Sequence, residues 1–292
     1  MRDHSTIKII DIHTHGLGGY DTVTASEHEI LTIAAMHGSH GVSEIVLAVY
    51  PASTGVMRDN MLAIKMAMDH QQAVRGDAAR IIGIHLEGPF LNPSRCGALD
   101  SASFLTPDQN ALKELIDGFE DIVKIITVAP ELEGAPALIK HIADLGINAS
   151  MGHSDATFAE AEEGFNAGAR GITHLFNAMR GIHHREPGLA GFGLIKNDIY
   201  TEVIADPFHL NRSIVELIFK VKNPERIIIV SDTVKAAHTG KVETGIKNQH
   251  DTLHGGSMTL KEAADRLISM GIDKGIVHKA VSENPVRYLQ GN

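Results

Sequence analysis

Eight short apolar segments, most of them rich in Ile and Val, recur along this chain and alternate with segments of helical spacing. This alternation is typical of a parallel sheet in which a helix follows each strand. Eight repeats favour a (β/α)8 TIM barrel of the α/β class. The predicted strands are Lys8–Ile12, Glu44–Tyr50, Arg80–Leu86, Ile122–Val128, Asn148–Met151, Gly171–Thr173, Tyr200–Ala205 and Arg226–Val230.

The segments between these strands carry helix signals, such as a Ser or Thr cap or a Pro in the first turn. The predicted helices are Ser26–Gly38, Met57–Val74, Pro136–Leu145, Ala156–Ala167 and Thr259–Met270, with another beginning at Thr106–Asp108. The chain has 292 residues, 43% of them hydrophobic, which is enough for one large core. We therefore expect a single barrel domain over residues 1–292, with an extended loop at 234–258 and C-terminal helices at 259–292.

Charge and cysteine content restrict the partners and the compartment. The chain has 26 basic and 36 acidic residues, a net charge of −10, which disfavours nucleic acid and anionic membranes and favours a small solute as partner. The single cysteine, Cys96, excludes an internal disulfide, and no apolar stretch is long enough to cross a bilayer. Because no signal-peptide pattern is seen either, we expect a cytoplasmic protein.

Polar side chains follow six of the eight predicted strands. They are His13 with His15, Glu87, His153, His174, His209 and Asp232. In a barrel of this type the catalytic groups lie at the C-terminal ends of the strands, so we expect these side chains to converge. Histidine and carboxylate ligands that leave coordination positions open for water are what a hydrolytic metal site requires. The pattern therefore predicts a metal-dependent hydrolase.

Two groups of metal ligands can be distinguished. Glu87, His153 and His174 supply one set of three. His13 and His15 are alternate residues of one strand and share a face, so they are suited to a second ion that Glu87 or a hydroxide would bridge to the first.

Asp232, at the end of the last predicted strand, is the expected proton acceptor for the attacking water and proton donor to the leaving group. Three of these candidate residues could instead have a purely structural role. Asp232 could cap a turn, Glu87 could form an ion pair with Arg95, and His153 could stand beside a helix that begins one or two residues later. Their joint occurrence at strand ends favours the metal site.

Several longer motifs occur in order between His13 and Thr233: DIHTHG, HLEGPFLNP, ITVAPE, MGHSDA, THLFNAM, REPGLAG and VSDT. Together they resemble the N-acetylglucosamine-6-phosphate deacetylase family of the amidohydrolase superfamily. The resemblance implies hydrolysis of the acetamide of an N-acetyl amino sugar 6-phosphate to acetate and the amino sugar phosphate. It also implies a divalent metal, zinc or iron, with one or two ions per subunit.

The resemblance implies a role for individual residues as well. Glu87, His153 and His174 correspond to the primary metal site, His13 and His15 to a second site that some members lack, and Asp232 to the general base and acid. The substrate phosphate would be bound by Asn177, Ala178, Arg185 and His209. In relatives the loop that carries the Arg can reach a neighbouring subunit, so a homodimer is implied.

Three departures from the family pattern stand out. The first predicted strand begins almost at Met1, so we expect the small β-sandwich of the family to be absent or vestigial. Leu99 takes the place of a His that would polarise the substrate carbonyl, so the metal acts alone, His183 or His184 substitutes, or the substrate differs. Pro207 replaces a Gly in the loop that carries His209.

These departures keep two other functions open. One is a related amidohydrolase acting on a non-phosphorylated carbohydrate or a cyclic amide. The other is a catalytically weak sugar-phosphate sensor. His and carboxylate ligands suit zinc and iron alike, and the motifs do not separate glucosamine from galactosamine substrates.

Overall fold

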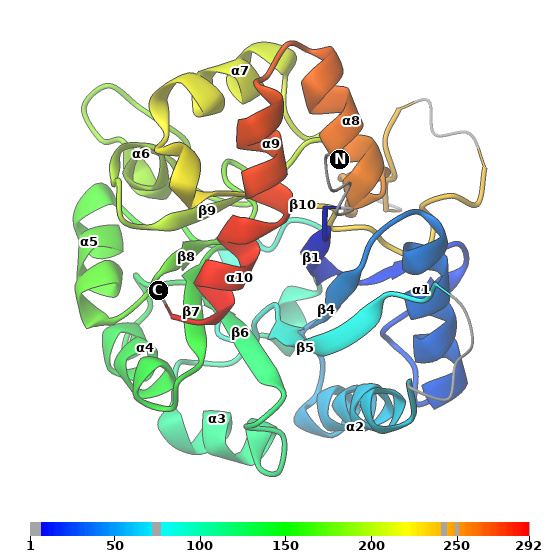
Figure 1. The fold of residues 1–292 in the computed structure, drawn as a ribbon. Helices are drawn as coiled ribbons and strands as arrows, with labels where there is room; N and C mark the ends of the chain where they lie inside the picture. Colours follow the sequence, from blue (N-terminus) through cyan, green and yellow to red (C-terminus); the bar gives the residue numbers. More distant parts are fainter. Residues whose placement is uncertain (1–6, 72–76, 241–243, 249–250, 292) are drawn as a thin grey trace.

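The computed structural model describes residues 7–71, 77–240, 244–248 and 251–291. Its main sheet confirms the predicted (β/α)8 barrel (Figure 1), because eight parallel strands follow one another in sequence order. They are β1 (Ile10–Thr14), β4 (Glu44–Val49), β5 (Arg80–Leu86), β6 (Val123–Val128), β7 (Asn148–Met151), β8 (Gly171–Ile172), β9 (Tyr200–Ile204) and β10 (Ile227–Val230). The backbone N–H of Asp232 donates to the carbonyl oxygen of His13 at 2.8 Å and joins the last strand to the first.

Helices form the outer ring around this sheet (Figure 1). They are α1 (Glu27–Ser39), α2 (Thr54–His70), α3 (Gln109–Ile116), α4 (Ala135–Asp144), α5 (Phe158–Ala167), α6 (Gly188–Ile195), α7 (Arg212–Val221) and α8 (Leu260–Ser269). The sequence analysis did not predict α6 and α7. Helix α6 contains three glycines and is buried along almost its whole length, so it has no polar face to give a helical period.

Some predicted boundaries were wrong. The first strand lies two residues later than predicted, so His13 is inside β1 and not after it. Helix α5 begins after its cap Thr157, two residues later than predicted, because a capping box with Glu160 fixes the start there. Residues 72–74 of the predicted second helix lie outside the described residues.

The N-terminal end of the barrel is closed by α10 (Glu283–Leu289), which follows α9 (Lys274–Val281) and lies across the strands in Figure 1. Tyr288 is buried there in an apolar cluster with Ile10, Tyr200 and Ile228. The side-chain amide of Asn284 donates to the carbonyl oxygen of Ile227 at 2.8 Å and fixes the helix to β10. This end of the barrel is packed, which leaves the C-terminal end for chemistry.

Outside the barrel, the described strands are β2 (Gly16–Leu17) and β3 (Tyr20–Asp21), which form a small antiparallel pair after β1. The described part of 234–258 contains neither helix nor strand, and residues 241–243 and 249–250 of this predicted loop lie outside the description. No helix in the described ranges is both long and apolar enough to span a membrane.

Candidate active site

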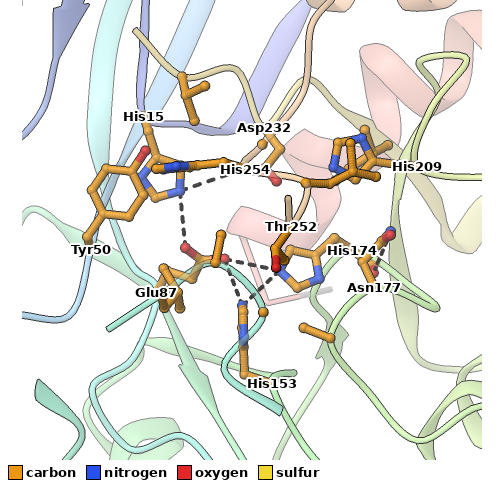
Figure 2. A pocket seen from close by; sticks show the side chains of 18 residues that line it. His15, Tyr50, Glu87, His153, His174, Asn177, His209, Asp232, Thr252 and His254 are labelled. Atoms are coloured by element: carbon orange, nitrogen blue, oxygen red, sulfur yellow. Dashed lines mark hydrogen bonds and ion pairs between the residues drawn. The ribbon is translucent and has the colours of Figure 1, made fainter. Parts of the chain in front are cut away.

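Three predicted ligands meet at the C-terminal end of the barrel (Figure 2). Glu87 directly follows β5, and His153 and His174 stand two residues after β7 and β8. The Glu87 Oε1 atom lies 3.1 Å from His153 Nε2 and 3.0 Å from His174 Nε2, and the two Nε2 atoms are 3.1 Å apart. All three side chains are buried. Three ligand atoms therefore surround one point.

The hydrogen bond at the far side of His153 indicates what this point can hold. Its Nδ1 lies 3.0 Å from the carbonyl oxygen of Arg95, which only accepts, so Nδ1 carries the proton and Nε2 presents a lone pair. That lone pair faces the carboxylate of Glu87. Two acceptors facing each other in a buried site repel unless a cation or a proton lies between them, so the set fits a divalent ion.

A second set of ligand atoms adjoins the first. His13, His15 and Asp232 each offer one atom, all within 4.8 Å of one another. Asp232 Oδ1 lies 3.5 Å from Nε2 of both histidines, and His15 Nε2 lies 3.1 Å from Glu87 Oε2. The buried Nε2 of His13 has no hydrogen-bond partner within the described part of the chain. An unpartnered imidazole nitrogen can bind a cation, so this Nε2 atom indicates a second cation position beside Glu87.

The backbone of three of these residues adopts the left-handed region that L-amino acids disfavour. The φ angles are 46° at His153, 30° at His174 and 48° at Asp232. Such a conformation costs about 1–3 kcal/mol for a residue other than glycine, and it persists only where the surroundings impose it. Its presence at three strand ends that face one cavity supports a functional role for these positions.

The electrostatics of the cluster are dominated by Glu87. Burial alone would raise the pKa of this carboxyl, but the surrounding imidazoles of His15, His153 and His174 hold that pKa well below its usual value. Burial would lower the pKa of His174, yet Glu87 raises it to about 9. Burial lowers the pKa of His13 to about 4. Glu87 is thus ionised, and it attracts positive charge to this end of the barrel.

The purely structural roles that the sequence allowed for Glu87, His153 and Asp232 differ from the contacts that the structure shows. Arg95 pairs with Asp155 at 2.8 Å and not with Glu87. Because α5 begins at Phe158, His153 does not stand beside its first turn. The carboxylate of Asp232 faces the imidazoles of the second ligand set.

The residues predicted to bind phosphate are only partly brought together. Asn177, Ala178 and His209 line the same cavity as the ligands, and Nδ1 of His209 is held 3.1 Å from Asp206. Arg185 is exposed, with its Nη1 3.0 Å from His184 Nε2, and it is not among the described residues that line the cavity.

Position 99 is a wall of the cavity, since Leu99 lines it. The neighbouring histidines proposed as substitutes, His183 and His184, are exposed and absent from the described lining. Within this chain the structure therefore does not bring them to the place of a His at position 99.

No family model matches the chain. The N-acetylglucosamine-6-phosphate deacetylase of Lysinibacillus sphaericus is 30% identical over 263 residues, covering 89% of this chain and 67% of that protein. This chain belongs to the N-acetylglucosamine-6-phosphate deacetylase family. The N-acetylgalactosamine-6-phosphate deacetylase of Escherichia coli O157:H7 is 31% identical over 248 residues, covering 85% of this chain and 64% of that protein. The chain thus spans about two thirds of the length of these relatives.

A solved structure of this deacetylase family agrees with the fold. It is a mutant of the N-acetyl-D-glucosamine-6-phosphate deacetylase from Mycobacterium smegmatis in complex with N-acetyl-D-glucosamine-6-phosphate. Its TM-score is 0.89 at 28% identity, covering 97% of this chain and 77% of that one.

The structure of this deacetylase-family chain also reveals cavity and interior residues that the sequence analysis missed. Tyr50, Thr252 and His254 line the cavity, and Glu202 and His85 are buried beside His13 inside the barrel. A charged or imidazole side chain within an otherwise apolar strand was the available signal for Glu202 and His85. His254 lies in a segment without a regular period, where the sequence carries no such signal.

Proposed function

We propose that this protein is a metal-dependent deacetylase that hydrolyses the acetamide of an N-acetyl amino sugar 6-phosphate, most favourably N-acetylglucosamine-6-phosphate. The products are acetate and the amino sugar phosphate. The observation that carries the proposal is the convergence of Glu87, His153 and His174 on one point in a cavity of a deacetylase-family barrel.

The metal would be held by these three residues, with His13 and His15 available for a second ion. A divalent cation there, zinc or iron, would polarise the amide carbonyl and lower the pKa of water. The protonated Nδ1 of His153 keeps its Nε2 directed at the ion, and Glu87 supplies the negative charge of the set.

Asp232 would move the proton. Its Oδ1 lies 3.5 Å from Nε2 of His13 and of His15, beside the cation position where the water would be activated. In the proposed reaction Asp232 accepts the proton of the attacking water and then gives it to the amine nitrogen as the C–N bond breaks. One residue thus serves as base and then as acid.

The phosphate would be bound at the other side of the cavity by His209, Asn177, the backbone at Ala178, and Arg185. Binding of this remote group would hold the amide carbonyl at the ion. The loop that carries Arg185 is exposed, which agrees with a homodimer in which it reaches a neighbouring subunit. A charged sugar phosphate does not readily cross a bilayer, so we propose the cytoplasm as the site of this activity.

The decisive test is Asp232→Asn. Turnover of N-acetylglucosamine-6-phosphate, measured as acetate release, should fall by about 10²–10⁴-fold, while the ion held by Glu87, His153 and His174 remains. Elemental analysis of the purified variant checks the metal. Asp144→Asn, at an exposed ion pair on α4, is the matched control and should keep full activity. An active Asp232→Asn enzyme would refute the role of Asp232.

A second function is favoured by the exposure of Arg185 outside the cavity. A related amidohydrolase acting on a non-phosphorylated sugar or a cyclic amide would not need this residue. Comparing acetate release from N-acetylglucosamine and from its 6-phosphate separates the two, because a phosphate-blind enzyme has equal kcat/KM for both. Tight binding of the sugar phosphate without acetate release would instead indicate a sensor.

A further inference from the structure

The segment after β10 places one histidine at the cavity that neither ligand set uses. The backbone N–H of His254 donates to the carbonyl oxygen of Ile246 at 2.8 Å. Two residues on, the N–H of Gly256 donates to the carbonyl oxygen of Asp232 at 2.6 Å. The backbone around His254 is therefore fixed to the strand end that carries Asp232, and the side chain has a defined place at the cavity.

That place is next to the metal ligands. His254 lines the cavity, and its ring meets the ring of Tyr50 edge-on at 6.1 Å between centroids. Tyr50 in turn stacks on His15 at 3.7 Å. In Figure 2, His254 lies on the side of His15 and Tyr50, whereas His209 lies on the opposite side of Asp232. His254 thus belongs to the end of the cavity where the amide would react.

Donors are scarce at this end of the cavity. Much of the wall is apolar, formed by Ala98, Leu99, Ile204 and Val234. The hydroxyl of Tyr50 is buried without a hydrogen-bond partner among the described residues, which makes it the other candidate donor at this end. An amide carbonyl that enters such a space without a donor loses its hydrogen bonds to water uncompensated.

The imidazole of His254 can supply a donor, because neither ring nitrogen is engaged by any residue that the structure describes. Burial, and then the charge of His15, lower the pKa of His254, so the ring is neutral at pH 7 and carries one N–H. A neutral imidazole donates a hydrogen bond without giving up its proton. Asp232 therefore remains the proton carrier.

We propose that His254 contacts the substrate directly, its imidazole N–H donating a hydrogen bond to the acyl carbonyl oxygen. This inference rests on the proposed deacetylation. The hydrogen bond strengthens as negative charge collects on that oxygen in the transition state, so His254 acts on kcat more than on KM. It is a donor contributed by the irregular segment at 234–258, separate from the metal ligands.

Two substitutions distinguish a hydrogen-bond donor at position 254 from a ring that only packs against Tyr50. His254→Phe keeps an aromatic ring beside Tyr50 but has no N–H, and His254→Gln keeps a donor without the ring. With the metal-loaded full chain and N-acetylglucosamine-6-phosphate, we expect kcat to fall by about a hundredfold for His254→Phe and by less for His254→Gln. Metal content and Tm should match the wild type. His28→Gln, at an exposed position of α1, is the control and should be unchanged.

The N-thioacetyl analogue locates the contact, because a thiocarbonyl sulfur accepts hydrogen bonds weakly. The loss caused by His254→Phe should shrink with this analogue relative to the oxygen substrate. Wild-type activity in His254→Phe, or an equal loss with both substrates, would overturn the inference while leaving the deacetylase intact. A wild type that releases neither acetate from the oxygen substrate nor thioacetate from the analogue would instead overturn the proposed function, and the role of His254 with it.

Discussion

The two sides of the cavity are held in different ways. Glu87, His153 and His174 are buried and lie within 3.1 Å of one another, each one or two residues beyond a barrel strand. Arg185 lies in the loop between β8 and α6 and is exposed, and its guanidinium hydrogen-bonds only to His184 among described residues. The metal side is assembled by the barrel, whereas the phosphate side depends on loops.

The difference follows from what fixes each backbone. Parallel strands are held in register by their neighbours, so the residue that follows a strand has a defined position. A loop residue has such a position only where its own contacts supply one. His209 is this intermediate case, because Asp206 accepts from its ring and from the backbone N–H groups of Phe208 and His209. Preorganisation should therefore decrease from Glu87 through His209 to Arg185.

The largest effect should come from Glu87→Ala. This carboxylate lies within 3.6 Å of four imidazoles, so its loss leaves them facing one another without their negative partner. We expect loss of bound metal by elemental analysis and a fall in kcat of about 10⁴-fold, which corresponds to several kcal/mol of charge stabilisation at 1.36 kcal/mol per tenfold.

Glu131→Gln is a demanding control for Glu87→Ala, because Glu131 is hydrogen-bonded near the same barrel mouth to Asn92 and Ser154 but is not a ligand. It should keep its metal. Full metal content and turnover in Glu87→Ala would break the comparison at its strongest point.

A smaller effect is expected at Glu202, the buried carboxylate on β9. It lies 3.0 Å from Nδ1 of His13, so it holds that proton and directs Nε2 at the second cation position. Glu202→Met should lower metal affinity by about 10- to 100-fold, and Glu202→Gln, which still accepts a hydrogen bond, by less. Competition with a chelator measures the affinity.

Comparing Glu202→Gln with Glu202→Met shows whether Glu202 positions the His13 ring or only fills space in the barrel. A residue needed only for packing would show its defect in the Tm of the metal-free protein, with Gln and Met alike in metal affinity. That result would remove Glu202 from the strand-assembled side of the comparison.

The barrel and the strand-end ligands were predictable because both depend on local and repetitive patterns. Eight apolar segments determine the sheet, and a polar residue at the end of a strand has few other places to go. His13 illustrates the limit of this reasoning. A shift of two residues moved it into β1, where it still reaches the cavity because alternate residues of a strand share a face.

The remaining parts of the site depend on contacts between distant segments, which no local pattern encodes. His254 reaches the cavity because Gly256 pairs with the backbone of Asp232, a tertiary contact. The family motif predicted that Arg185 binds the phosphate, but the structure places this residue outside the cavity lining. A loop side chain can match a motif and still lie outside the cavity of its own chain.

The smallest effect should come from Arg185→Ala. Because this side chain is exposed, its attraction for a phosphate is weakened by water and salt, and we expect KM for N-acetylglucosamine-6-phosphate to rise by about twofold to fivefold with kcat unchanged. His209→Ala, at a buried and anchored imidazole, should raise KM by about tenfold or more. Steady-state kinetics at two salt concentrations measure both.

A loss for Arg185→Ala as large as that for His209→Ala would mean that Arg185 reaches the phosphate in the working protein. That would be the case in a homodimer whose loops enter each other's cavities, and the two sides of the cavity would then be equally preorganised.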